Sequence, residues 1–240
     1  MSVRHVSSSA PLAIITGATR GIGLAIAREL ARRGLRLALL ARRAGPLRRA
    51  ARELTARAPS VSARVCDVRK PAQVRRVFAR LLRGNSRVAV LVNNAGIGRF
   101  GPLHRFSDAD WDATLETNLR GVFLCSKAVL PRMIAQRSGH IINIGSLAGH
   151  NTFAGAAAYC ASKWGLRGLS ACLAEDVRAH GIRVSHICPG SVHTEFSPHA
   201  GKDPKKMLQP GDVARVVGWL LEQEPQSFVS EILLRPTQKP

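Results

Sequence analysis

The stretch TGATRGIG, Thr16 to Gly23, follows directly on the apolar run LAIIT at 12–16 and leads into a helical pattern at 21–33. Its glycines let the backbone turn tightly and come close to a bound group. The N-terminus of the helix that follows offers free N–H groups and the positive end of its dipole, which together hold a pyrophosphate. A glycine cluster alone is weak evidence, but one directly after the first strand of a β–α–β unit is much stronger. The stretch therefore predicts a dinucleotide-binding turn.

Outward from this turn, short apolar runs alternate with longer amphipathic patterns. We expect strands at 12–16, 35–40, 61–66, 88–92, 140–145, 182–188 and 231–234, and helices at 21–33, 45–57, 71–83, 108–136, 158–179 and 211–222. Glycines stand where four of these helices should stop, at Gly34, Gly84, Gly139 and Gly181. Such alternation implies a parallel sheet with helices on both faces. We predict an α/β fold, a single doubly wound Rossmann-type domain with a mostly parallel seven-stranded sheet.

The domain limits follow from composition along the chain. The opening MSVRHVSSSA is polar and lacks the apolar segment of a secretory signal, so residues 1–10 are expected to form a flexible tail. No linker, repeat or low-complexity block divides the remainder, which predicts one domain over 11–240. Its main irregular stretch, at about 191–210, is expected to form a substrate loop.

Composition restricts the classes of function. With 240 residues and 45% hydrophobic residues, the chain is long and apolar enough for a full core, and no apolar run approaches the roughly 20 residues of a membrane span. The five cysteines are scattered, without a C-x-x-C pair, and the eight histidines show no metal-ligand spacing. We therefore expect neither a disulfide framework nor a metal site, and we expect a reducing, cytoplasmic compartment.

The formal net charge of +21 permits a nucleic-acid partner, an acidic partner or a solvated basic surface. Most arginines lie on helical repeats between apolar residues, and no interleaving of aromatic and basic residues marks a strand-binding surface. We interpret the charge as the polar faces of amphipathic helices, and we expect neither a nucleic-acid nor a membrane partner.

Tyr159, the only tyrosine, is followed four residues later by Lys163. In a helix, residues at this spacing share one face. An ammonium favours the phenolate and lowers the pKa of a hydroxyl that is otherwise near about 10. Taken alone, the pair still favours a simpler interpretation, a half-buried tyrosine beside a surface lysine.

The end of the second predicted strand bears on cofactor choice. An acid at this position would bind the ribose 2′-hydroxyl of NAD, but the chain has Ala41, Arg42 and Arg43 there, and Arg20 in the glycine turn. Guanidinium groups suit a phosphate. We predict NADP(H), held by Arg20 and Arg42, with Arg43 facing solvent.

Further motifs follow in order along the chain. They are CDV at 66–68, NNAG at 93–96, Asn118 in ETNLRG, Ser146 in NIGSLAG, Tyr159 with Lys163, and PGSVHT at 189–194. With TGATRGIG, they make the chain resemble the short-chain dehydrogenase/reductase family over essentially its whole length, in particular its 3-oxoacyl-(acyl-carrier-protein) reductases and NADP-dependent carbonyl reductases.

The resemblance implies a catalytic set. Ser146 would orient a substrate carbonyl, and Tyr159 would exchange a proton with its oxygen. Lys163 would stabilise the phenolate and hold the nicotinamide ribose, and Asn118 would keep a water in line behind Lys163. A lone Ser or Asn is more often a satisfied turn or helix residue, but the complete set favours the catalytic interpretation.

The resemblance also implies cofactor contacts. Asp67 would accept from the adenine amino group, with capping of the following helix as an alternative or additional role. Val192 and Thr194 would fix the nicotinamide carboxamide. The full set predicted for the cofactor is Gly17, Thr19, Arg20, Gly21, Ile22, Gly23, Arg42, Asp67, Val68, Asn94, Ala95, Gly96, Tyr159, Lys163, Pro189, Gly190, Val192 and Thr194.

The function implied is NADP(H)-dependent reduction of a ketone, 3-oxoacyl group or aldehyde to an alcohol. Two alternatives stay open: oxidation of a small hydroxy acid or secondary alcohol, and a non-catalytic nucleic-acid or regulatory binder on this fold. The substrate, a small molecule or one linked to a carrier, would meet an apolar pocket near Phe100, Leu147, Phe153 and Phe196. Apolar residues on more than one face of the helices at 108–136 and 158–179 indicate a homodimer or homotetramer. Trp164 could face that interface or the core.

Overall fold

The computed structural model describes residues 10–84, 87–196 and 201–240, and within them seven strands form one sheet. The strands are β1 (Leu12–Thr16), β2 (Arg36–Ala41), β3 (Val61–Val65), β4 (Val88–Asn93), β5 (Gly139–Ile144), β6 (Ile182–Pro189) and β7 (Glu231–Leu234). Their order is β3-β2-β1-β4-β5-β6-β7, and all six neighbouring pairs are parallel. The predicted doubly wound fold is confirmed, with a sheet that is fully parallel in the described part.

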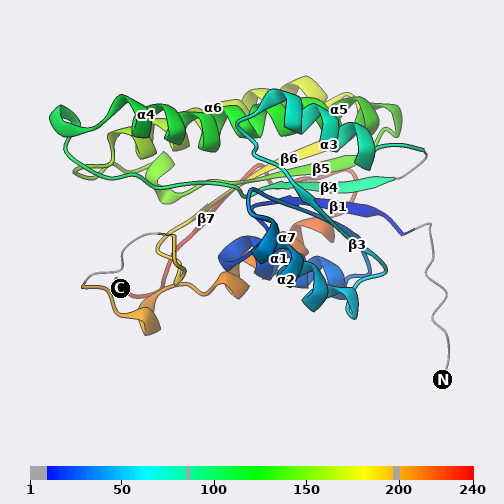
Figure 1. Cartoon of the computed structure of the whole chain (residues 1–240), viewed down its shortest axis with the longest axis horizontal. Coiled ribbons are helices and arrows are strands. Elements are labelled where there is room, and N and C mark those ends of the chain that lie inside the picture. Colours follow the sequence, from blue (N-terminus) through cyan, green and yellow to red (C-terminus); the bar gives the residue numbers. More distant parts are fainter. Residues whose placement is uncertain (1–9, 85–86, 197–200) are drawn as a thin grey trace.

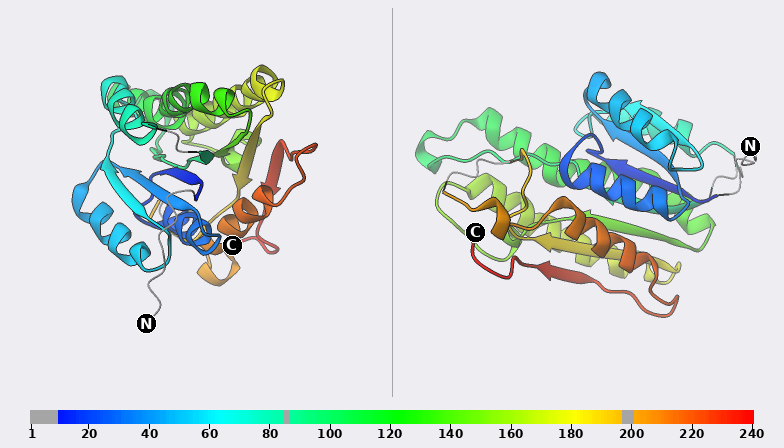
Figure 2. Two further views of the ribbon diagram at one scale, coloured as in Figure 1. Left: turned by 90° about the vertical axis from the view of Figure 1, so that its right-hand side faces the viewer. Right: turned by 90° about the horizontal axis from the view of Figure 1, so that it is seen from below.

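Helices cover both faces of this sheet (Figure 1). One layer contains α1 (Gly21–Arg32), α2 (Ala44–Thr55) and α7 (Pro210–Leu221). The other contains α3 (Pro71–Leu81), α4 (Asp108–Leu115), α5 (Gly121–Ala135) and α6 (Ala157–Arg178). The two views of Figure 2 show the same three layers from the side and from below.

Alternating side chains of the central strands supply two separate cores. In β1, Ala13 and Ile15 pack in the cluster beneath α1, α2 and α7, whereas Leu12 and Ile14 pack in the cluster beneath α3, α5 and α6. Successive side chains of a strand point to opposite faces. This explains why the first four residues of LAIIT, 12–15, are all apolar, as expected of a strand buried on both sides.

One predicted helix is interrupted. The pattern at 108–136 forms α4, then a π-helical segment (Glu116–Arg120), then α5. At the junction the N–H of Gly121 donates to the carbonyl of Glu116, five residues back. The pattern at 108–136 is apolar on more than one face, so the one-residue shift at a single wider turn does not stand out in it. Each of the other predicted helices and strands lies within two residues of its observed bounds.

The carboxyl ends of the strands form the edge that matters for function. Between β1 and β4 the strand order reverses, and such switch points open a crevice for ligands. The loop predicted at 191–210 is closed at its base by a bridge between Val192 and Leu208, and its residues 197–200 lie outside the described residues. The predicted N-terminal tail also lies outside them, apart from residue 10. Within the described ranges, no helix combines the length and apolarity needed to cross a membrane.

Candidate active site

The glycine turn begins the site, between β1 and α1. Gly21 has φ +51°, which disfavours other residues, and a Cβ on Gly23 would lie 2.4 Å from the carbonyl oxygen of Gly17. Arg20, the N-cap residue, is extended, and its side chain does not cap the first turn of α1. That turn also contains no acidic residue. The turn therefore presents free N–H groups and suits an anionic group such as a pyrophosphate.

Hydrogen bonds from β4 hold this turn in place. The side-chain amide of Asn94 donates to the carbonyl oxygens of Thr16 and Gly17, at 3.1 and 3.2 Å. In return, the Thr16 hydroxyl accepts from the N–H groups of Asn94 and Ala95, at 3.0 Å each. The adjacent ends of β1 and β4 are thus joined side chain to backbone, which fixes the crevice at the switch point.

A cavity of about 570 Å³ runs along this edge of the sheet. Every residue predicted to bind the cofactor lines it, as do the predicted substrate-pocket residues Phe100, Leu147, Phe153 and Phe196. Ser146, Tyr159 and Lys163 line it as well. Among the predicted catalytic residues, Asn118 does not line the cavity, although its neighbour Thr117 does.

Tyr159 and Lys163 lie one turn apart near the start of α6 and are only 8% and 6% exposed. The simpler interpretation of a surface lysine is therefore wrong. The Lys163 ammonium donates to the carbonyl oxygen of Ile144, at 3.0 Å, and lies 5.7 Å from the centre of the Tyr159 ring. Burial raises the pKa of Tyr159 to about 12, which the Ser146 side chain partly offsets. Burial lowers the pKa of Lys163 to about 8.

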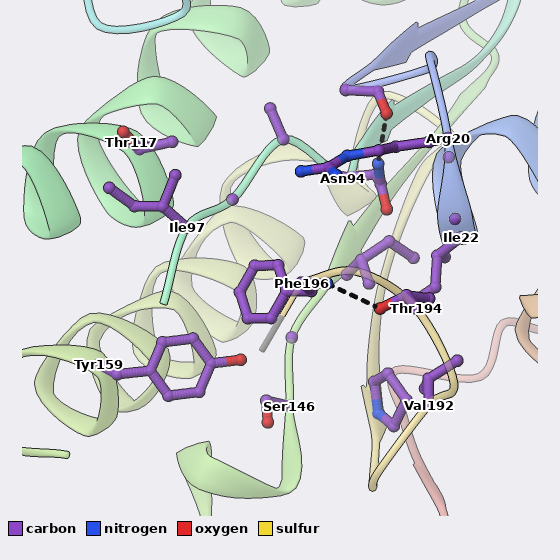
Figure 3. Close-up of a pocket in the computed structure, with 18 of the residues that line it drawn as sticks. Arg20, Ile22, Asn94, Ile97, Thr117, Ser146, Tyr159, Val192, Thr194 and Phe196 are labelled. Atoms are coloured by element: carbon purple, nitrogen blue, oxygen red, sulfur yellow. Dashed lines mark hydrogen bonds between the residues drawn. The ribbon is translucent and has the colours of Figure 1, made fainter. Parts of the chain in front are cut away.

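Ser146 follows β5 and begins a short 3-10 turn (Leu147–Gly149). Its hydroxyl oxygen accepts from the N–H of Ala148, at 3.1 Å, which leaves the hydroxyl hydrogen for another acceptor. Figure 3 shows the Tyr159 hydroxyl and Ser146 bordering the same opening. The two hydroxyl groups can thus address one oxygen atom of a bound molecule.

Asn118 lies in the π segment, outside the cavity lining, and its side chain holds two neighbouring segments together. Its side-chain oxygen accepts from the N–H of Ile97, at 2.8 Å, and its amide donates to the Ile97 carbonyl, at 2.9 Å, and to the Ser162 hydroxyl, at 3.0 Å. The side chain therefore ties the loop after β4 to α6. The predicted water relay behind Lys163 is not tested by these contacts.

At the other end of the cavity, the Asp67 carboxylate is paired with the side chain of Arg69. The Arg69 guanidinium contacts both carboxylate oxygens, with its closest nitrogen at 2.7 Å. Burial alone would raise the pKa of Asp67, but these bonds hold it below its usual value. The alternative of a helix cap is wrong, because Lys70 is the N-cap residue of α3 and Asp67 lies too far ahead.

The predicted phosphate-binding arginines are exposed around this end. Arg20 forms an ion pair with Glu195, at 3.3 Å, across the cavity from the glycine turn to the loop after β6. Arg42 lines the cavity and lowers the pKa of Asp67 through its charge. Arg43, which we expected only to face solvent, is exposed but also lines the cavity.

Comparison with known proteins identifies the family. The model of the family described as short chain dehydrogenase matches residues 11–205. The chain is a short-chain dehydrogenase. It is 39% identical over 215 residues to the 3-oxoacyl-(acyl-carrier-protein) reductase of Bos taurus, covering 87% of this chain and 90% of that protein.

Two solved structures show the same fold. A metagenomic short-chain oxidoreductase in complex with NADP is 44% identical, with a TM-score of 0.85, and the match covers 97% of this chain and 100% of that chain. A variant of actinorhodin polyketide ketoreductase with NADPH is 33% identical, with a TM-score of 0.86 and coverages of 94% and 95%. Enzymes of the short-chain dehydrogenase family are oxidoreductases, so the predicted enzyme class is confirmed.

Sequence reasoning missed one partly buried polar cluster of this dehydrogenase, near Ser146. A Glu231 carboxylate oxygen lies 3.2 Å from a ring nitrogen of His150 and 3.2 Å from one of His186, and Arg167 donates to it at 3.1 Å. The thiol of Cys188 lies 3.4 Å from His186. Apart from His186 and Cys188, which are two residues apart on β6, these residues are far apart in the sequence, and no local spacing relates them.

Donor atoms of His150, Cys188 and Glu231 lie within 4.8 Å of one another, which a metal ion would require. However, the carboxylate already accepts from the Arg167 guanidinium, which balances its charge without an ion. Burial also raises the pKa of Cys188 to about 11, which keeps it a thiol. We therefore assign the cluster to hydrogen bonding within the protein.

Proposed function

We propose that this short-chain dehydrogenase reduces a carbonyl group to an alcohol with NADPH, and that Tyr159 supplies the proton. The observation that carries the proposal is the burial of Tyr159 and Lys163 on one face of α6, in the same cavity as Ser146. Two buried titratable groups with opposite pKa shifts in one cavity are typical of an acid–base site.

The roles follow from the protonation states. With a pKa raised to about 12, Tyr159 keeps its proton at neutral pH and can donate it. Ser146 has a hydroxyl hydrogen to donate to the carbonyl oxygen, which orients the carbonyl toward Tyr159. Below its pKa of about 8, Lys163 is a cation and stabilises the phenolate that remains after the proton leaves. When bound, NADPH supplies the hydride.

NADP(H) fits the residues of the cavity. The glycine turn offers its uncapped helix N-terminus to a pyrophosphate, and Arg20 and Arg42 lie where β1 and β2 end. The sequence has no acidic residue at the end of β2 that would bind the ribose 2′-hydroxyl of NAD. NADP or NADPH is present in both solved relatives described above. We assign Asp67 and Val68 to the adenine, and Val192 and Thr194 to the nicotinamide end.

We propose a second copy of the chain as partner, through the outer face of α4, α5 and α6. Phe123 and Trp164 are both 45% exposed there, which excludes a core position for Trp164. A shallow groove on this face is lined by apolar side chains, among them Leu115, Leu119, Phe123 and Leu169. Sedimentation at moderate salt should give a dimer or tetramer, whereas a fully active monomer at micromolar concentration would contradict this assignment.

The five cysteines all lie within the described residues and are free, which supports the proposed reducing, cytoplasmic location.

NADPH oxidation with a panel of ketones, aldehydes and 3-oxoacyl thioesters tests the proposed reaction. Wild-type protein should consume NADPH with at least one of these compounds, and Tyr159→Phe should not. If neither protein turns over any carbonyl or alcohol, and the chain binds nucleic acid with a steep salt dependence, the non-catalytic alternative is correct.

A further inference from the structure

Three phenylalanines surround the one tyrosine at the substrate end of the cavity. The chain has seven phenylalanines in all, and aromatic residues make up 5% of it. The Phe100 ring lies 5.5 Å from that of Tyr159, nearly edge to face, and the Phe196 ring lies 5.9 Å from it. Phe153 lies 6.0 Å from Phe100. These separations fall within the range in which aromatic rings attract one another.

The three phenylalanine rings line the cavity and are not covered by the protein. Phe100, Phe153 and Phe196 are 41%, 53% and 41% exposed. They also belong to three separate segments, which follow β4, the short turn after Ser146, and β6. An exposed apolar surface inside a concave site is the surface that a ligand covers. The chain thus assembles an uncovered aromatic surface next to the group that we assign as proton donor.

The backbone leaves space for this arrangement at Gly98. A Cβ on Gly98 would lie 2.8 Å from Phe100 and 3.1 Å from Phe196. Both rings therefore pack against bare backbone, and Figure 3 shows the Phe196 ring beside the opening into which the Tyr159 hydroxyl points. A side chain at position 98 would push the rings apart.

Charge at this end of the cavity disfavours small acids. Of the arginines among the described lining residues, Arg42 and Arg43 lie at the adenosine end, and Arg20 reaches across the cavity to an ion pair with Glu195 at 3.3 Å. Lys163 is held by the Ile144 carbonyl, and Lys202 donates to the Ser191 hydroxyl, at 2.8 Å. A carboxylate close to Tyr159 would thus meet phenyl rings in place of the guanidinium fork that binds carboxylates best.

We infer that the substrate carries an aromatic ring next to the carbonyl that is reduced. This inference rests on the proposed function and narrows its substrate class. The ring of the substrate packs edge or face against Phe100, Phe153 and Phe196, which places its carbonyl oxygen within reach of Tyr159 and Ser146.

Binding can be separated from turnover, because the enzyme saturated with NADP⁺ has no hydride to give to a ketone. Calorimetry on this complex should compare ethyl benzoylacetate with its cyclohexyl counterpart, which has similar bulk and no aromatic ring, and with ethyl acetoacetate. We expect the phenyl compound to bind at least roughly 5-fold more tightly than either of the others. Equal affinities for the phenyl and cyclohexyl compounds would overturn the inference.

A variant pair locates the effect. Phe153→Leu keeps an apolar side chain but removes a ring, and it should reduce the preference for phenyl over cyclohexyl by roughly 3-fold or more. Phe228→Leu makes the same change at a partly buried ring that lines neither the cavity nor the proposed interface, and it should leave the preference unchanged. An unchanged preference in Phe153→Leu would also overturn the inference.

Turnover with NADPH then distinguishes the two proposals. If the phenyl compound binds preferentially but no ketone is reduced, the proposed reaction fails and the aromatic site stands. If ethyl acetoacetate is reduced and bound as well as the phenyl compound, the reaction stands and the aromatic site fails.

Discussion

The two ends of the cavity are built differently. At the reaction end, Tyr159 and Lys163 are buried near the start of a 22-residue helix. At the adenosine end, Arg20 and Arg42 are exposed on loops. Electrostatic interactions are strong in a buried, low-dielectric setting and are screened at the surface. A single change should therefore have a large effect at the reaction end and a moderate one at the adenosine end.

The largest effect is expected at the proton donor. Tyr159→Phe removes only the hydroxyl and should lower turnover by about 10³- to 10⁴-fold, the upper part of the range for a general acid. NADPH binding, measured by fluorescence titration, should stay within a few-fold of wild type. Near-normal turnover in this variant would refute the assigned mechanism.

A somewhat smaller effect is expected at the lysine. Lys163→Met keeps most of the apolar stem but removes the charge, and should lower turnover by about 10²- to 10³-fold because the phenolate loses its stabilising cation. NADPH affinity should fall as well, unlike in Tyr159→Phe. Steady-state kinetics with parallel binding titrations would show whether the two buried residues differ in this way.

At the adenosine end, Arg42→Asp should weaken NADPH binding by roughly 10- to 100-fold, since it removes charged hydrogen bonds and adds repulsion. NADH, which has no 2′-phosphate, should lose much less affinity. Arg48→Asp on α2 makes the same charge change outside the cavity and serves as control. Wild-type protein that prefers NADH in side-by-side kinetics would contradict the cofactor assignment.

The pH dependence follows from the reaction end. The pKa of Lys163 is lowered to about 8, so its charge is present below that pH and is lost above it. Tyr159, with a pKa of about 12, stays protonated throughout. The rate of carbonyl reduction should therefore fall by up to about tenfold per pH unit above pH 8. A flat profile from pH 7 to 9.5 would show that the lysine charge does not assist the reaction.

The smallest effect is expected at the ion pair that spans the two ends. Glu195→Gln removes the charge that faces Arg20 at the surface, and should raise NADPH affinity by about 2-fold or less. The change should fade further in high salt. A tenfold effect would mean that this exposed pair behaves like the buried groups.

The residues predicted from the sequence line both ends of the cavity, with the exception of Asn118. The glycine turn, the strand ends and the motif residues are each recognised from a short segment of the sequence. All of the predicted cofactor residues line the cavity. Contacts between segments that are distant in the sequence could not be predicted from such short motifs. The bonds from Asn118 to Ile97 and Ser162, and the pairing of His186 with Glu231, depend on how the folded chain brings these segments together.

Two further features show why local patterns have this limit. The π turn at Glu116–Arg120 shifts the helix register by one residue, and this shift is hidden because the sequence there is apolar on more than one face. The need for glycine at position 145 is visible only in the folded structure. A Cβ there would lie 2.1 Å from the ring of His186, which is 41 residues further along the chain.

The bridge between Val192 and Leu208 has a consequence for how this enzyme can diversify. It consists of two backbone hydrogen bonds, from His193 to Leu208 and from Leu208 to Ser191, at 2.8 and 3.0 Å. The two ends of the predicted substrate loop, between β6 and α7, are thereby fixed to each other. The number of residues between them can change at little cost, since lengthening a closed loop adds only a small entropy term, whereas Thr194 and Phe196 are residues to which we assign ligand contacts. Changes in this loop could therefore alter the substrate specificity of the enzyme, in evolution or by design. The sheet, the cofactor turn and α6 would stay unchanged.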